Sequence, residues 1–113
     1  MLRNPRQARR YTEPVELRYA APRVDEYGHA SLGEPETVLR AFAHVSQMSA
    51  AKTLMTFQQA DVVGVDIEMR WTPAVFNSVR WKGRDIVFSQ PENVGERNRI
   101  LRISGYYQLP NPL

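Results

Sequence analysis

A strict alternation of apolar and polar side chains near the middle of the chain most limits what it can fold into. The run from Asp61 to Trp71 reads DVVGVDIEMRW, and every second position is apolar, namely Val63, Val65, Ile67, Met69 and Trp71. Side chains on a β-strand point alternately to its two faces, so this spacing predicts a half-buried strand. The five apolar residues are expected on one face.

The same spacing of two recurs along the chain and predicts further strands at residues 15–19, 37–46 and 100–107. Two more apolar runs, at 79–81 and 85–88, are separated by a short piece that contains Lys82 and Gly83. Glycine readily takes the positive φ of a tight turn, so Lys82 and Gly83 predict a β-hairpin turn. Together these elements predict an all-β (mainly) class, either a small antiparallel β-barrel of five to six strands or a sandwich.

Two segments interrupt the strand pattern. Residues 47–60 read QMSAAKTLMTFQQA, with apolar residues three and four positions apart, good helix formers, and Ser49 where it could cap a helix. This insertion is expected to be a short helix, or a loop that orders only in an assembly. Residues 21–36 collect two prolines and two glycines, which predicts a long connection, ribbon-like around Asp25 to Gly28.

The 113 residues suit one compact domain, which we place at 11–113. The first ten residues hold Arg3, Arg6, Arg9 and Arg10 without an acid, so of a net charge of +3 the other 103 residues carry −1 (3 − 4). Residues 1–10 are therefore predicted to be a flexible Arg-rich arm. Such an arm suits contact with DNA phosphate or an acidic protein partner, although a solvated terminus explains it equally well.

No apolar stretch approaches the length of a membrane span, and residues 1–20 lack the apolar centre of a signal peptide. We therefore expect no membrane association and synthesis in the cytoplasm. The chain has no cysteine, which rules out disulfides and thiolate metal sites.

Side chains that could carry out catalysis are sparse. His29 lies in the Gly/Pro-rich connection and His44 inside a predicted strand, where it is expected to be an ordinary strand residue. Asp61, Asp66 and Glu68 could form a carboxylate cluster, but exposure to solvent explains them equally well. No nucleophile elbow or phosphate-binding glycine loop is present in the sequence. We predict no catalytic, cofactor-binding or metal-ligating residues, and no enzyme activity.

Aromatic residues alternate with arginines over 70–107, which is also seen in nucleic-acid platforms. Adjacent residues of a strand point to opposite faces, so a barrel with aromatic residues inside and arginines outside gives the same pattern. The second interpretation is favoured.

Several short motifs occur in a characteristic order. They are the strand end AFAHV at 41–45, the Gln/Ala-rich insertion at 46–60, the polar strand, turn and IVF run at 79–91, the closing strand at 99–105, and the DEYG turn at 25–28. In this order the chain resembles the head-tail joining family of tailed bacteriophages. Within that family it is most similar to the head-completion or stopper proteins of siphophage or gene-transfer-agent particles.

The resemblance implies a structural protein of the virion neck that is assembled in the host cytoplasm. It would form a homo-oligomeric ring, typically a dodecamer, below the portal and adaptor proteins. The ring would close the exit channel on packaged double-stranded DNA and dock the tail-completion or tail-terminator proteins.

The insertion is the candidate channel gate, because it is long for a connection and its apolar residues have no clear place in one barrel. The gate residues are Gln47, Met48, Lys52, Leu54, Met55, Phe57, Gln58 and Gln59. A packed helix that covers the barrel remains an equal alternative for this segment. For the whole chain, the alternatives are a tail-completion ring protein of the same fold and a small-barrel nucleic-acid-binding module.

Overall fold

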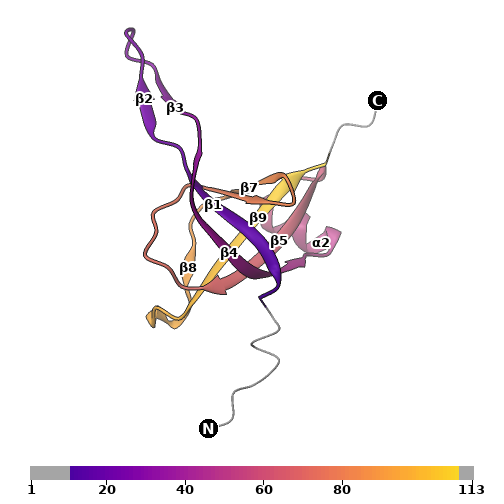
Figure 1. The fold of residues 1–113 in the computed structure, drawn as a ribbon. Coiled ribbons are helices and arrows are strands. Elements are labelled where there is room, and N and C mark those ends of the chain that lie inside the picture. The colour runs from indigo at the N-terminus through magenta and orange to yellow at the C-terminus, as the bar shows by residue number, and fades with distance from the viewer. Residues whose placement is uncertain (1–10, 110–113) are drawn as a thin grey trace.

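Six antiparallel strands close into a barrel in the computed structural model, which describes residues 11–109 (Figure 1). The strands are β1 (Glu13–Tyr19), β4 (Glu36–Gln47), β5 (Val62–Arg70), β6 (Ser78–Trp81), β7 (Arg84–Phe88) and β9 (Ile100–Gln108). Their order is β5-β4-β1-β6-β7-β9, and β9 pairs back with β5 along its whole length, which closes the barrel. The predicted all-β class and small antiparallel barrel are confirmed.

Five smaller elements complete the fold. The strand β8 (Glu92–Asn93) adds to β9, and the 3-10 turn η1 (Val94–Glu96) follows it. The helix α2 (Ala50–Phe57) lies between β4 and β5, and a separate ribbon of β2 (Pro22–Val24) and β3 (Ala30–Leu32) lies between β1 and β4. Within residues 11–109, no helix has the length and apolar character that crossing a bilayer requires.

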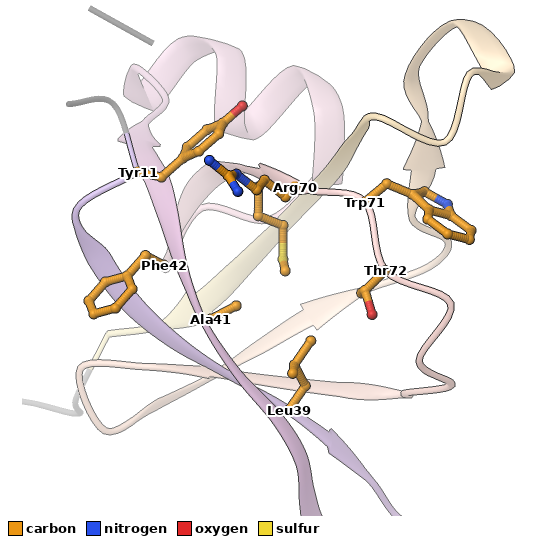
Figure 2. A pocket seen from close by; sticks show the side chains of 8 residues that line it. Tyr11, Leu39, Ala41, Phe42, Arg70, Trp71 and Thr72 are labelled. Carbon is orange, nitrogen blue, oxygen red and sulfur yellow. The ribbon is translucent and has the colours of Figure 1, made fainter. Parts of the chain in front are cut away.

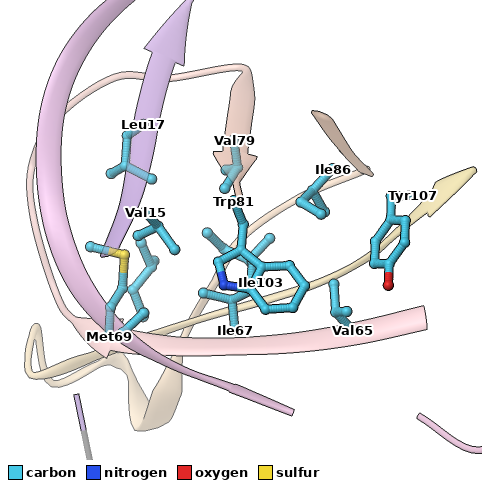
Figure 3. Close-up of a cluster of buried hydrophobic side chains, with 12 residues drawn as sticks. Val15, Leu17, Val65, Ile67, Met69, Val79, Trp81, Ile86, Ile103 and Tyr107 are labelled. Atoms are coloured by element: carbon cyan, nitrogen blue, oxygen red, sulfur yellow. The ribbon is translucent and has the colours of Figure 1, made fainter. Parts of the chain in front are cut away.

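The core fills the barrel interior with side chains from alternate positions of every long strand (Figure 3). On β5, the predicted inward residues Val65, Ile67 and Met69 are at most 1% exposed, whereas Val63 and Trp71 at its two ends are half-buried. Branched side chains dominate this interior because they pack well on a pleated surface.

A glycine allows β7 to approach β9 closely enough to close the barrel. A Cβ atom at Gly105 would lie 2.5 Å from the carbonyl oxygen of Val87 and 2.7 Å from the Ile86 side chain. The backbone of Val87 cannot move away without breaking its pairing with Tyr106. Only a residue without a side chain fits at this crossing.

The predicted hairpin is present between β6 and β7. Trp81 pairs with Arg84, and the two residues between them have positive φ, 51° for Lys82 and 72° for Gly83. Positive φ at both central positions is the type I′ geometry whose twist matches that of a β-hairpin. The prediction for Lys82 and Gly83 as turn residues is therefore confirmed.

Candidate assembly surface

The insertion between β4 and β5 is a helix with both ends capped. The Ser49 side chain accepts a hydrogen bond from the backbone N–H of Lys52 at 3.1 Å, as the sequence predicted for a capping serine. The helix ends where Gln58 takes a left-handed φ of 57° and its N–H bonds the carbonyl of Leu54. Of the two expectations for this segment, the short helix is confirmed.

Helix α2 packs on the outer wall of the barrel through one polar residue and a glycine. Thr53 is 3% exposed; its hydroxyl donates to the carbonyl of Ser49 at 2.9 Å and accepts from the N–H of Gly64 at 3.2 Å. A Cβ at Gly64 would lie 2.7 Å from that hydroxyl and 2.8 Å from the sulfur of Met48. The absence of a side chain on β5 at this point therefore lets the helix lie against the strand.

Four of the eight predicted gate residues, Met48, Lys52, Phe57 and Gln59, contact the barrel wall. Phe57 packs on Tyr106 with ring centroids 4.9 Å apart, and the Gln59 amide donates to the Tyr106 hydroxyl at 2.9 Å. The Lys52 ammonium lies 3.7 Å from the Asp66 carboxylate, and the Gln47 amide donates to Tyr107 at 3.4 Å. Met48 adds its sulfur beside Gly64, and Gln58 forms the cap.

The other two predicted gate residues, Leu54 and Met55, are 50% and 82% exposed. The predicted set therefore comprises four residues that contact the wall, Gln47 on β4, Gln58 at the helix cap, and two that leave an apolar outer face on the helix. Thr53, which binds α2 to the barrel most closely, was not predicted, because a threonine among apolar residues gives no periodic signal.

The strand face beside α2 carries a charged cluster that sequence reasoning described only in part. Glu68 is 7% exposed, so the expectation of a solvent-exposed side chain is wrong for this residue. Its carboxylate lies 3.6 Å from the Arg102 guanidinium and accepts from the Tyr11 hydroxyl at 3.4 Å. These partners, on β9 and at the start of the described chain, are distant in sequence and compensate the burial of the charge.

The conceivable cluster of three carboxylates does not form, although Asp66 and Glu68 share one face of β5. Asp66 accepts a hydrogen bond from the Ser104 hydroxyl at 2.6 Å on the same wall, whereas Asp61 precedes β5, where its carbonyl accepts from Leu109. His44 lies on β4 opposite Glu68, and His29 lies at the tip of the β2–β3 ribbon beside Asp25. Among the described residues, no three His, Asp or Glu side chains come together in a way that could hold a metal ion.

Aromatic and basic residues meet at the β6–β7 hairpin. Trp81 and Tyr107 are each 5% exposed, and the Arg84 guanidinium lies over both rings, 5.8 Å and 4.6 Å from their centroids. The interpretation of aromatic residues inside and arginines outside is right for these residues. It is wrong for Tyr106, which lies on the outer wall under Phe57.

The β2–β3 ribbon stands away from the barrel as an arm (Figure 1). Every residue of its two strands is exposed, including Val24 at 71% and Leu32 at 67%. Sequence analysis predicted a ribbon here but not its apolar character. The arginines of the N-terminal segment, Arg3, Arg6, Arg9 and Arg10, lie outside the described residues.

A second feature is a crevice in the barrel wall where β4 and β5 part (Figure 2). These strands pair only from Ala43 to Gln47 of β4, so the first half of β4 diverges from the end of β5. The gap has a volume of about 480 Å³, and its lining includes the half-buried Leu39 and Trp71 and the exposed Phe42.

Comparisons with known proteins support the fold. No family model matches the chain, and no curated protein matches it. Among solved structures, the chain is similar to the solution structure of protein SF1141 from Shigella flexneri 2a, a structural genomics target. The TM-score is 0.58 at 13% sequence identity, and the match covers 90% of this chain and 96% of the other. At this identity the similarity shows a shared fold alone.

Proposed function

We propose that this chain is a structural subunit of a ring at the head-tail joint of a tailed-phage-type particle. The observation that carries the proposal is the placement of apolar residues on two projections outside a complete barrel core. Val24 and Leu32 on the arm and Met55 on α2 are 71%, 67% and 82% exposed, and nothing in the described chain covers them. Apolar surface gathered on projections marks sites of protein–protein contact.

The order of sequence motifs supports the choice of this assembly. The resemblance to head-completion or stopper proteins includes the strand end at 41–45, the insertion at 46–60 and the hairpin at 79–91. The closed barrel is the fold which that resemblance implies. In this proposal the ring binds the portal and adaptor on one side and the tail-completion protein on the other, around packaged DNA.

Within such a ring, helix α2 is the candidate gate. Its attachment to the wall leaves Leu54 and Met55 free to contact the same residues of neighbouring copies at the channel axis. Met48, Lys52, Phe57 and Gln59 would then fix the helix, and these two would close the channel.

A tail-completion ring of the same fold uses the same surfaces and is the second candidate. The nucleic-acid module is less favoured because of a specific observation. Trp81 and Tyr107 are each 5% exposed and are already covered by Arg84, so their faces are not available for bases to stack upon.

A test is to delete the gene from the strain that carries it and to examine the particles. We expect DNA-filled heads that lack tails and lose their DNA, with wild-type particles restored when the gene is supplied in trans. Tailed particles of normal yield would overturn the proposal. Tight binding of duplex DNA by the monomer, falling steeply with salt, would favour the nucleic-acid module instead.

A further inference from the structure

The β2–β3 arm is amphipathic, although both of its faces are exposed. Pro22 pairs with Leu32 and Val24 pairs with Ala30, while Arg23 pairs with Ser31 between them. Alternate residues of a strand share a face, so Pro22, Val24, Ala30 and Leu32 form one apolar face and Arg23 and Ser31 lie on the other. A two-stranded ribbon with a bare apolar face is only marginally stable in water, so this face calls for a partner.

The tip and base of the arm are held in one shape by local hydrogen bonds. One Asp25 carboxylate oxygen accepts from the N–H groups of Tyr27 and His29, at 2.9 and 2.8 Å. The other oxygen lies 3.2 Å from the His29 ring, and at the base the N–H of Gly33 donates to the carbonyl of Ala21 at 2.8 Å. An arm that is ordered before it binds loses less entropy on docking.

The crevice between β4 and β5 offers a surface of matching chemistry. Its lining is mixed, with the apolar residues Leu39, Ala41, Phe42, Met69 and Trp71 beside the polar residues Tyr11, Arg70 and Thr72 (Figure 2). Phe42 is 63% exposed, so it presents an apolar edge to an incoming partner.

Charge also favours this pairing. The arm, residues 22–32, contains Arg23 against Asp25 and Glu26, a net charge of −1 (1 − 2), and Glu34 lies just beyond its base. At the crevice, Arg70 is exposed, and the carbonyl of another exposed arginine, Arg99, accepts from the N–H of Trp71. An acidic arm and a basic lip attract each other across a contact between copies.

We propose that the apolar face of the arm of one copy docks into the β4–β5 crevice of the next copy. The arm points away from the barrel that carries the crevice, so a molecule cannot fill its own (Figure 1). The contact uses two different surfaces and is therefore heterologous, and such contacts repeat from copy to copy and form a ring when the rotation between copies closes. This inference deepens the proposed function by naming the interface between ring subunits, and it rests on that proposal for the closure of the ring.

Disulfide trapping tests the contact even when association is weak, because the natural chain has no cysteine. Leu32→Cys places a thiol on the apolar face of the arm, and Phe42→Cys places one at the crevice lip. Ser31→Cys is the matched control on the polar face of the same ribbon. All three positions are exposed, so the variants are expected to fold like the parent chain, and circular dichroism verifies this.

The two partners are mixed at high protein concentration in a glutathione buffer, one of them labelled with 15N so that mass spectrometry separates mixed from identical pairs. A disulfide needs Cα atoms within about 7 Å, so it reports which face of the arm enters the crevice. We expect L32C–F42C pairs to form several-fold faster than S31C–F42C pairs. Adding Arg70→Glu to the F42C chain is expected to slow the L32C–F42C reaction.

Equal rates for L32C and S31C would overturn the inference, as would a predominance of L32C–L32C pairs, which would show arm-to-arm docking. The proposed function is judged separately by the gene deletion. A failed trap together with tailless particles would leave the neck function standing and assign the arm to another partner. Successful trapping, together with normal particles from the deletion strain, would support the contact between copies and rule out the neck function.

Discussion

Two glycines allow close contacts between elements of this fold. Gly105 lets β7 reach β9, and Gly64 lets α2 lie on β5. The two differ in what a side chain would meet. At Gly105 the nearest atom is a backbone oxygen of Val87, whereas at Gly64 it is the side-chain oxygen of Thr53.

Replacing Gly105 by alanine is therefore expected to destabilise the barrel by about 1–3 kcal/mol or more, as overpacking does at sites that cannot relax. Gly64→Ala is the matched control, with a smaller loss because Met48 and Thr53 can shift. Chemical denaturation of both variants measures the difference. A Gly105→Ala chain as stable as the Gly64→Ala chain would show that β7 and β9 have room to separate.

The hairpin turn gives a second residue-scale prediction. Gly83 has φ of 72°, where a β-branched residue costs roughly 1–2 kcal/mol or more, so Gly83→Val should lower the melting temperature clearly. Lys82→Ala should lower it less, because a non-glycine residue already occupies φ of 51° there and only its contact with the Trp81 ring is lost. Equal melting temperatures would mean that the turn tolerates a branched side chain.

At the scale of elements, what the sequence could predict follows from how local each signal is. The strand at 61–71, the hairpin and the capped helix were predictable because spacing and turn residues within a few positions encode them. The roles of Thr53 and Glu68 were not, since each depends on partners that only the fold brings near, Gly64 across the wall and Arg102 on β9. The apolar face of the arm depends on the pairing register of β2 with β3, which the sequence alone leaves open.

Helix α2 is expected to be removable with the flanking strands still paired. The β4–β5 pairing over Ala43–Gln47 does not involve the helix, and among helix residues only Thr53 is buried. A variant with Ser49 to Phe57 replaced by a short Gly/Ser link should keep its β-sheet circular dichroism and melt at a lower temperature. Particles that carry it are expected to leak DNA, which nuclease digestion of the packaged genome measures.

A matched variant tests the gating role of α2 while the helix stays packed on the barrel wall. The double change Leu54→Ser with Met55→Ser keeps the docking residues of α2 and removes its exposed apolar face. It should fold with unchanged stability and still leak. A deletion variant that cannot fold would show that α2 belongs to the structural core. A deletion variant that folds, joins the particle and retains DNA would show that this segment is not the gate.

At the scale of the whole molecule, the arm makes the chain elongated. Its principal dimensions are 60 × 34 × 25 Å, and its radius of gyration is 16.0 Å, against about 13 Å for a compact domain of similar length. The outer wall of the barrel carries charged residues such as Arg80, Asp85 and Arg102, although Val75 and Val87 are also exposed, at 73% and 50%.

We therefore expect the isolated protein to be monomeric or only weakly associated, with assembly triggered by the adaptor surface. Light scattering at micromolar concentration measures this. A stable ring formed by the protein alone would contradict the expectation that partners trigger assembly.

The most direct measurement of the central claim is electron cryo-microscopy of the particle neck. The account predicts a ring of this barrel below the adaptor, with the β2–β3 arm of each copy lying in the β4–β5 crevice of the next and Leu54 and Met55 facing the channel axis. The account would be contradicted by a high-resolution map of the neck in which other proteins explain all of the density and no ring of this chain is present.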